Sequence, residues 1–172
     1  MSTPPRPTDD ELRDLVDRAA VLDLQARYAD VVTRRAWDEL TGLFLPDATV
    51  HIDTVTRDPF TVTGPGELGR FIGGAVERFD FFEFVILNSL VELRDGGDPD
   101  AAAARVFMCE QRRVATDGGW STAYGLYRDR YRRVDGCWWF ADRSYRSLAR
   151  TGEDGGAFPF PHLPPSPGGG RG

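Results

Sequence analysis

Four long segments with the composition of β-strands follow one another in the second half of the chain. They cover residues 81–93, 104–115, 120–134 and 137–149, and each is rich in β-branched and aromatic residues. Short turn sequences separate them, and Asp135-Gly136 strongly favours a tight hairpin. Because strands joined by short turns pair antiparallel, this half of the chain predicts a meander.

Helical patterns occupy much of the first half. The sequence TDDE at residues 8–11 is a capping box, from which a helix is expected to run to about Arg35. A short helix over 36–44, a strand over 48–55 and a third helix over 67–79 are expected to follow. Helices followed by a meander predict the α+β class, with one curved sheet wrapped against three N-terminal helices.

Length and composition bound the kind of protein. The chain has 172 residues, 41% of them hydrophobic, and no apolar run long enough to cross a bilayer. We expect a flexible N-terminus over residues 1–8, a single domain over 9–150 and a Gly/Pro-rich tail over 151–172. The N-terminus lacks the pattern of a secretory signal, so a cytoplasmic protein is expected.

Charge and residue usage exclude several functions. A formal net charge of −6 argues against a nucleic-acid partner. Histidine and cysteine occur twice each, at spacings that fit no metal or redox site. The segment GPGELG at 64–69 matches the glycine pattern of dinucleotide-binding loops, but the strands that follow lack the alternation with helices that such a site needs. We interpret its glycines as a turn and a loose helix start.

The first helix has two different faces. Asp30 and Arg34 are spaced as an ion pair on the solvated face, so Asp30 is interpreted as a surface residue. The opposite face is apolar but carries Gln25, Tyr28 and Thr33. Buried polar groups need partners, so we predict that this face borders a pocket.

The strand over 120–134 separates its charged residues by face. Three arginines, Arg128, Arg130 and Arg132, alternate with Tyr127, Asp129 and Tyr131. A row of arginines points to solvent, so Asp129 is predicted to lie inside among tyrosines. There it either pairs with an arginine, with Arg143 on the next strand as the favoured partner, or has a raised pKa and acts as acid or base.

Other strands supply weaker candidates. Asn88 shares a face with Phe82, Phe84, Ile86 and Leu90, so its amide is predicted to need a partner inside, and a ligand oxygen is one option. Glu110 is a second candidate carboxylate, on a strand whose inward face the sequence does not fix. His51 alternates with Val50 and Ile52, which predicts Val50 inside and His51 on the surface. His162 could reach a pocket mouth only if the tail segment AFPFPHL, residues 157–163, folds back as a lid.

Three parts of the chain together resemble the SnoaL-like branch of the nuclear transport factor 2-like superfamily. They are the segment 17–50, Asn88 on a long strand, and the segment 124–143 with its pattern YGLYRDRYRRVDGCWWFADR. The resemblance spans about residues 9–150. It implies a cone-shaped α+β barrel around an apolar pocket, a homodimer or homotrimer, and a small apolar or aromatic molecule as partner. Relatives such as polyketide cyclases, scytalone dehydratase, ketosteroid isomerase and a dehydrochlorinase act without metal or cofactor, so none is expected here.

Many members of this branch carry an aspartate near the end of the first helix and a histidine four residues before the strand asparagine. Here the corresponding positions hold Thr33 and Phe84, and neither is a proton-transfer group at neutral pH. The fold is implied, but the Asp–His mechanism is not.

Three hypotheses therefore stay open. The chain is a cofactor-independent lyase, isomerase or cyclase in which Asp129 or Glu110 moves the proton, a binding or assembly protein that keeps only the cone, or a structural partner of an oxygenase. The residues predicted to bind the substrate are Gln25, Tyr28, Thr33, Val50, Phe84, Asn88, Tyr127 and Arg143.

Overall fold

The structure is a computed structural model that describes residues 6–152 and 155–163. Its elements are α1 (Asp9–Arg34), the 3-10 helix η1 (Trp37–Gly42), β1 (Phe44–Asp53), β2 (Phe60–Thr63), α2 (Gly64–Val76), β3 (Phe79–Leu93), the 3-10 turn η2 (Asp95–Gly97), β4 (Ala101–Val114), β5 (Trp120–Val134), β6 (Cys137–Arg150) and β7 (Gly156–Ala157). Parts of the predicted N-terminus and tail, at 1–5, 153–154 and 164–172, lie outside the described residues.

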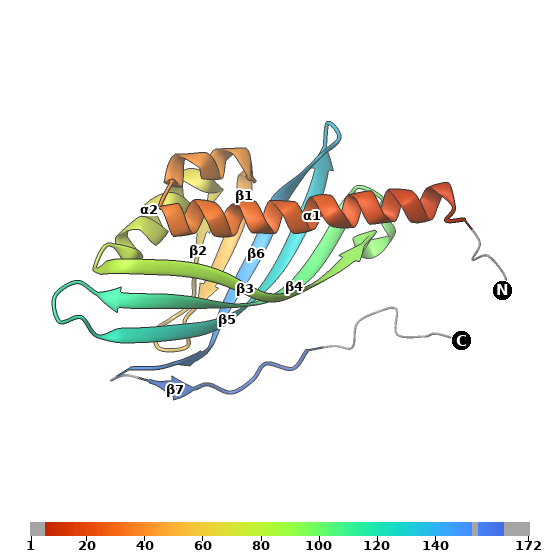
Figure 1. Ribbon diagram of the computed structural model, residues 1–172. Coiled ribbons are helices and arrows are strands. Elements are labelled where there is room, and N and C mark those ends of the chain that lie inside the picture. Colours follow the sequence, from red (N-terminus) through yellow and green to blue (C-terminus); the bar gives the residue numbers. More distant parts are fainter. Residues whose placement is uncertain (1–5, 153–154, 164–172) are drawn as a thin grey trace.

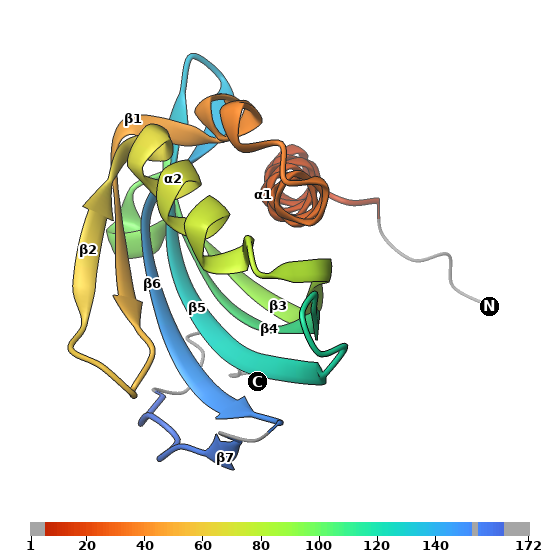
Figure 2. The same ribbon diagram turned by 90° about the vertical axis from the view of Figure 1, so that its left-hand side faces the viewer.

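The described strands form one curved sheet. Its order is β2-β1-β6-β5-β4-β3, with β7 added beside β6. Strands β3 to β6 form the predicted antiparallel meander, whereas β1 lies parallel to β6, so the sheet is mixed. Figure 2 shows the sheet curling around α1 and α2, which lie on its concave side. The predicted α+β class and the three N-terminal helices against a curved sheet are confirmed.

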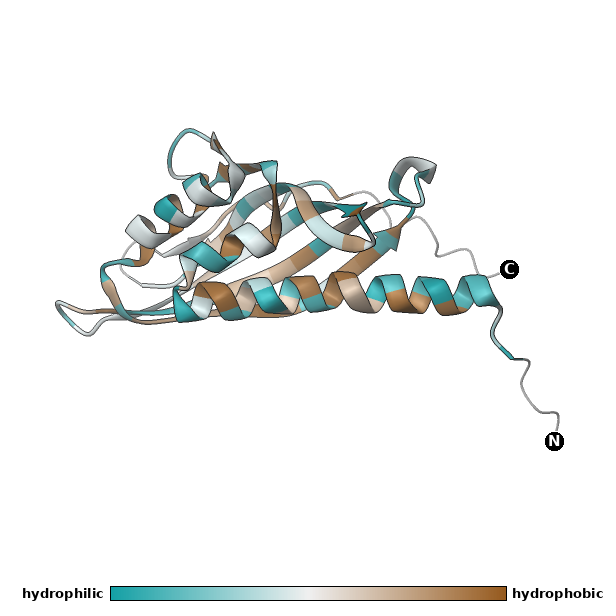
Figure 3. Ribbon diagram, turned by 90° about the horizontal axis from the view of Figure 1, so that it is seen from above, coloured by the Kyte–Doolittle hydropathy of each residue, from teal (hydrophilic) through white to brown (hydrophobic). Residues whose placement is uncertain are grey.

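The first helix begins and ends where its local chemistry dictates. The Thr8 hydroxyl accepts the Glu11 backbone N–H at 3.2 Å, and the Glu11 carboxylate accepts the Thr8 N–H at 2.7 Å. The helix ends where Arg35 adopts a left-handed φ of 59°. Its buried residues recur at helical spacing, at Val21, Leu24, Gln25, Tyr28, Val31 and Val32. Figure 3 shows the resulting alternation of apolar and polar bands along α1.

Polar contacts fix how α1 lies across the sheet. Near its N-terminal end, Asp17 accepts hydrogen bonds from Arg133 Nη1 at 2.7 Å and Trp138 Nε1 at 3.1 Å. Near its other end, Asp30 pairs with Arg34 on the solvated face, as predicted. Figure 1 and Figure 2 show α1 lying on the concave side of the sheet, beside β3. The helix therefore covers one side of the concave face.

Some elements differ from their predicted bounds. Strands β2 and β7 were not predicted, β1 begins at Phe44, and α2 begins at Gly64 within the glycine-rich segment. A Cβ on Gly69 would lie 3.2 Å from Trp37 Cβ, and one on Gly73 would lie 3.2 Å from Trp37 Nε1. Glycine at these positions lets α2 pack closely against the tryptophan of η1. This contact favours the structural interpretation of the glycines.

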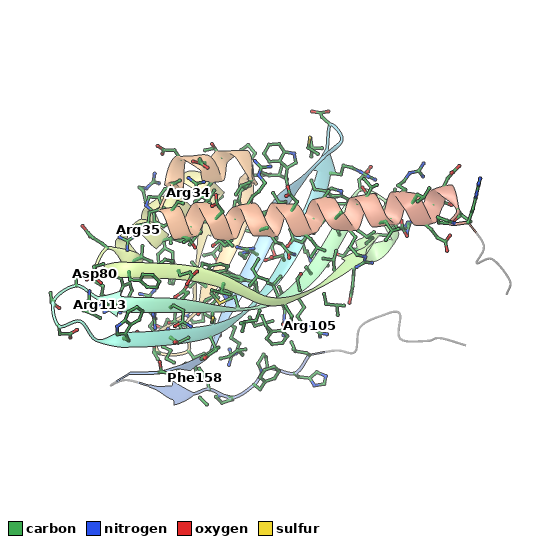
Figure 4. The ribbon with its side chains drawn as sticks, in the orientation of Figure 1. Arg34, Arg35, Asp80, Arg105, Arg113 and Phe158 are labelled. Atoms are coloured by element: carbon green, nitrogen blue, oxygen red, sulfur yellow. The ribbon has the colours of Figure 1, made fainter. Side chains whose placement is uncertain are left out.

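The described part of the tail lies on the outer face of the sheet. Strand β7 pairs with β6 through Ala149 and Ala157, and the Phe160 ring stacks on Phe107 with ring centroids 6.2 Å apart. Pro161 and the buried Leu126 line a small cavity of about 220 Å³ between tail and sheet. Figure 4 shows Phe158 beneath the sheet, on the side away from α1. Residues 155–163 cover outward apolar side chains, and the prediction that this segment closes the pocket is wrong.

Candidate functional site

The concave face of the sheet and the helices enclose a cavity of about 360 Å³. This volume falls in the range of about 300–1,000 Å³ typical of small-molecule sites. Apolar side chains from α1, α2, β1 and β3 form much of its wall, among them Val32, Val50, Leu68, Phe71, Ile72 and Phe84. Tyr28, Tyr127 and Tyr145 add hydroxyl groups, and five arginines with one carboxylate complete the charged lining among the described residues.

A buried ion pair lies beneath the cavity. Arg143 Nε and Nη2 donate to the two oxygens of Asp129 at 2.7 and 2.8 Å, and the two residues are 2% and 1% exposed. The Tyr131 hydroxyl also donates to Asp129 at 2.8 Å, and Gln25 Nε2 donates to that hydroxyl oxygen at 2.8 Å. The predicted pairing of Asp129 with Arg143 is confirmed. Both carboxylate oxygens of Asp129 accept hydrogen bonds, and the residue does not line the cavity. Asp129 therefore has a structural role.

Arg143 nevertheless reaches the cavity. Its guanidinium carbon lies 4.1 Å from the ring centroids of both Tyr28 and Tyr127 and 4.4 Å from that of Phe140. Burial opposes the charge of Arg143, but Asp129 together with Tyr28 and Tyr127 more than offsets burial, so the pKa of Arg143 lies above its ordinary value. Its Nη1 is turned away from Asp129 and has no hydrogen-bond partner within the described chain. Arg143 thus keeps one buried donor for a ligand.

The cavity tyrosines stay protonated at neutral pH. Burial raises the pKa of Tyr28, Tyr127 and Tyr145, and the negative charge of Glu110 adds to the increase at each of them. A neutral phenol offers one O–H donor. The site therefore carries three hydroxyl donors close enough to Glu110 to respond to its charge.

Glu110 is the carboxylate of the cavity. Alternate residues of β4, such as Met108, are buried inward, and Glu110 continues this face. Its side chain keeps 23% exposure because it faces the hollow, and Arg112 Nη1 lies 3.7 Å away, beyond hydrogen-bond distance. Burial raises the pKa of Glu110, although Arg112 and Arg150 oppose that increase. The carboxylate is only loosely neutralised.

Register places Glu110 in a row that crosses the sheet. It lies opposite Phe84 on β3 and opposite Ala123 on β5, and Ala123 in turn lies opposite Arg150 on β6. The four residues of this row all line the cavity. Antiparallel partners on one face have Cβ atoms about 4.5–5.5 Å apart, so the row brings Glu110 against an aromatic ring on one side.

Asn88 does not reach the cavity. A register shift between Ile86 and Asn88 in the pairing of β3 with β4 marks a β-bulge. Phe82 and Phe84 before the bulge and Val91 after it are buried, while Asn88 is exposed. One extra residue reverses the alternation, and the prediction that Asn88 faces inward is wrong.

Two polar residues of α1 serve the fold instead of the cavity wall. The Thr33 hydroxyl accepts the Phe84 backbone N–H at 3.0 Å. Gln25 is 2% exposed and its amide is engaged with Tyr131 deeper in the core. Neither residue lines the cavity, although both were predicted to. Of the predicted site residues, those in the wall are Tyr28, Val50, Phe84, Glu110, Tyr127 and Arg143.

Four of the cavity arginines and one tyrosine were missed by sequence reasoning: Arg57, Arg78, Arg112, Arg150 and Tyr145. Arg112 lies two residues after Glu110, so fixing the inward face of β4 would have found it. Arg150 was predicted only as the last residue of the domain. The pairing of β5 with β6 shifts register between Tyr124 and Gly125, and this irregularity, which the sequence does not reveal, precedes the pair of Ala123 with Arg150 that lines the cavity. His51, as predicted, is exposed, with Nδ1 3.2 Å from the Thr61 hydroxyl oxygen.

Among the described residues, His, Cys, Asp and Glu side chains form no group of three or more that could hold a metal ion. Within the same part of the chain, no helix has the length and apolar character that a membrane crossing requires.

Comparison with known families settles the relationship that the fold suggests. The family model of the SnoaL-like domain matches residues 13–144. The chain belongs to the SnoaL-like domain family. This SnoaL-like domain spans most of α1, the other helices, most of the sheet, and the whole cavity wall except Tyr145 and Arg150.

Solved structures share the fold of this SnoaL-like chain. A scytalone dehydratase-like protein from Novosphingobium aromaticivorans DSM 12444 is 22% identical, with a TM-score of 0.68 over 80% of this chain and 88% of that chain. The hexachlorocyclohexane dehydrochlorinase LinA-type3 from Novosphingobium barchaimii LL02 is 20% identical, with a TM-score of 0.69 over 90% and 99%. An NTF2-like protein with a cystatin-like fold from N. aromaticivorans is 22% identical, with a TM-score of 0.65 over 80% and 85%.

Proposed function

We propose that this SnoaL-like protein is a cofactor-independent lyase, isomerase or cyclase that acts on a small aromatic or polyketide-like molecule in its cavity. One observation carries the proposal: Glu110 faces the cavity between an aromatic ring and two arginines, and burial raises its pKa. A carboxylate with a raised pKa is a stronger base when ionised, which suits removal of a proton from carbon.

The cavity offers the groups that such a reaction needs. Glu110 would take a proton from the carbon next to a carbonyl group, and the released electron pair would move onto the carbonyl oxygen as an enolate. The hydroxyls of Tyr28 and Tyr127 and the free Nη1 of Arg143 line the same cavity and supply donors for that oxygen. From the enolate, expulsion of a group on the next carbon gives an elimination, return of the proton elsewhere an isomerisation, and attack on a second carbonyl a ring closure.

The family comparison supports a lyase-type reaction. One structural neighbour is named a dehydratase and another a dehydrochlorinase, and both names describe eliminations. The positions where the resemblance places an Asp–His pair hold Thr33 and Phe84, so this chain would need a different base. Glu110, directly opposite Phe84, supplies one.

The proposal also covers the location, the partner and the oligomeric state of the protein. We infer a cytoplasmic protein whose partner is a small molecule and not a nucleic acid or a membrane, and which assembles as a homodimer or homotrimer. The exposed apolar side chains of α1, Leu12, Leu15 and Val16, are 46%, 61% and 67% exposed and support an assembly surface.

A second candidate is a non-catalytic binding or assembly protein with the same cavity. The hydrogen bond between the Thr33 hydroxyl and the Phe84 N–H favours it, because the two Asp–His positions are then committed to holding α1 against β3. The sealed Asp129–Arg143 pair points the same way, since it removes the other buried carboxylate from chemistry.

Hydrogen–deuterium exchange separates the two candidates. The wild-type chain is incubated with 2-tetralone in D₂O, and loss of the α-proton signal is followed by NMR, with Glu110→Gln beside it. Glu83→Gln is the matched control, because Glu83 is exposed on the neighbouring strand β3. A general base typically contributes about 10²–10⁴-fold, so Glu110→Gln should slow exchange by that factor while Glu83→Gln leaves it unchanged.

Two results would favour the binding candidate. One is wild-type exchange no faster than in buffer for 2-tetralone and a wider set of cyclic ketones that bind in a thermal-shift assay. The other is equal exchange by the wild-type chain and Glu110→Gln.

A further inference from the structure

The charge inside the cavity is unbalanced. Arg143 is neutralised by Asp129, but Arg57, Arg78, Arg112 and Arg150 also line the cavity. Against these four stands Glu110, the one carboxylate that the described residues contribute to the wall. Arg57 and Arg78 are exposed, so water screens their charge. Arg112 and Arg150 are more enclosed, and the apolar wall weakens the screening of their charge, which therefore acts more strongly on whatever enters.

Two of these arginines keep buried donors unused. The Nε atoms of Arg112 and Arg150 are buried and, within the described chain, make no hydrogen bond. Buried polar groups in native proteins nearly always have a partner, so orphan donors beside a cavity indicate a ligand acceptor. Arg112 is well enclosed, with its side chain 13% exposed.

The two guanidinium groups also act on each other. Burial lowers the pKa of Arg112, Glu110 opposes that change, and the positive charge of Arg150 adds to it. Both arginines likewise act on Glu110. Geometry agrees: Arg112 Nη1 lies 3.7 Å from Glu110, and Arg150 lies in the same cross-strand row as Glu110, with Ala123 between them. Two cavity arginines thus share one carboxylate, and a second anion would lower their repulsion.

Aromatic surface adjoins the arginines. The guanidinium carbon of Arg112 lies 5.4 Å from the Phe79 ring centroid, and that of Arg78 lies 4.8 Å from it. Phe71 and Phe84 line the same cavity. A ligand with a negative head and a flat ring would match both parts of the wall.

We propose that the ligand of this cavity is an aromatic or alicyclic carboxylate, whose carboxylate lies against Arg112 and Arg150 while its ring contacts Phe79 and Phe84. This inference rests on the proposed function in placing the substrate in the same cavity. It narrows the substrate from any small apolar molecule to an organic anion. The exposed Arg57 and Arg78 at the rim would draw such an anion inward.

A matched pair of probes tests the inference. Binding of 2-naphthoate and 2-naphthamide, which share a ring system and differ in charge, is measured by calorimetry and thermal shift at low and high salt. The wild-type chain should bind the acid at least about tenfold more tightly than the amide, and added salt should weaken binding of the acid alone. Arg112→Met and Arg150→Met should remove that preference. Arg130→Met, at a position 72% exposed on the outer face, is the control of equal charge change.

The outcomes distinguish the two proposals. Three outcomes would overturn the anion inference: equal binding of acid and amide, binding of neither, or an unchanged preference for the acid in both pocket variants. If a variant fails to fold, the salt dependence of binding by the wild-type chain still tests the inference. Glu110→Gln should bind 2-naphthoate at least as tightly as the wild-type chain, because it removes a competing negative charge. If Glu110→Gln binds 2-naphthoate this tightly but catalyses α-proton exchange at the wild-type rate, then Glu110 is not the base, while the inferred anion site is still supported.

Discussion

Glu110 lies directly opposite Phe84 in the antiparallel pairing of β3 with β4, and both side chains face the same cavity. Phe84 occupies the position where the family resemblance places a histidine. The ring of Phe84 meets Tyr28 edge-on, with centroids 5.4 Å apart, so the site around it is aromatic and poorly solvated. The titratable group that we propose as base therefore comes from β4, one strand away from the position where the resemblance implies a histidine.

The first prediction concerns stability against pH. Because the folded-state pKa of Glu110 is raised above 4.5, the native chain holds a proton that the unfolded chain releases. The contribution of Glu110 to the free energy of unfolding should therefore fall as pH rises from 4.5 through the raised pKa. In Glu110→Gln this decline should be absent, as urea unfolding from about pH 5 to about pH 8 would show.

Comparing the pH dependence of the free energy of unfolding between the wild-type chain and Glu110→Gln separates the effect of Glu110 from that of other titratable groups. The tyrosines on which the charge of Glu110 acts, Tyr28, Tyr127 and Tyr145, stay neutral across this range in both proteins. Carboxylates whose pKa is lowered by surface pairs, such as Asp30, contribute equally to the two curves. Identical slopes in the two proteins would show that Glu110 is solvated like an ordinary surface glutamate.

The second prediction concerns the buried ion pair. Asp129→Asn leaves the charge of Arg143 buried without a counter-ion, and breaking such a pair costs about 3–5 kcal/mol of the free energy of unfolding. Asp30→Asn removes the same charge from an i,i+4 surface pair whose carboxylate is 60% exposed, so it should cost far less than Asp129→Asn. Urea unfolding at neutral pH measures both. A loss for Asp129→Asn as small as that for Asp30→Asn would mean that the pair is not desolvated.

The fold follows closely from local patterns. The capping box at Thr8, the turn at Asp135-Gly136 and the alternation of Tyr127 to Arg132 each depend on neighbouring residues, and the structure has each feature as predicted. Where prediction failed, the cause was a long-range pairing. Strand β2 is only Phe60–Thr63 and is defined by its partner β1. No periodicity in four residues reveals a partner.

The site is predicted less well from the sequence, because the register of strand pairing decides which side chains lie together. A single bulge after Ile86 moves Asn88 from the cavity to solvent, and nothing in its neighbours signals the extra residue. Asp129 was correctly predicted to lie inside. Whether its carboxylate was available for proton transfer depended on Arg143, which lies directly opposite it and forms an ion pair with it. Glu110 remained a secondary candidate because its strand reads ambiguously from the sequence alone.

The third prediction concerns the shape of the cavity. A Cβ on Gly125 would overlap the Tyr145 ring and lie 2.9 Å from Met108 Sδ. Gly125→Ala should force the tyrosine toward the cavity, lower stability by about 1–3 kcal/mol and weaken binding of a two-ring probe. Gly74→Ala is the control, since a Cβ there meets nothing within 4 Å and alanine in a helix interior should stabilise by about 0.5–1 kcal/mol. Thermal unfolding and calorimetry would show both effects, and equal behaviour of the two variants would contradict the close packing around Gly125.

The fourth prediction concerns the tail. Residues 155–163 pack on the outer face, with Phe160 over Phe107 and the Phe158 N–H bonded to the Leu148 carbonyl at 2.9 Å. A chain ending at Gly152 should therefore lose stability, because Leu126 and Phe107 become exposed, while its affinity for a cavity ligand stays within about twofold of the full chain. Binding of 2-naphthoate together with thermal unfolding tests both halves of this prediction. Much weaker binding by the shortened chain at a temperature where it is fully folded would mean that the tail acts on the cavity after all. Phe160→Ser, which disturbs only the outer stack, shows whether any loss comes from that contact.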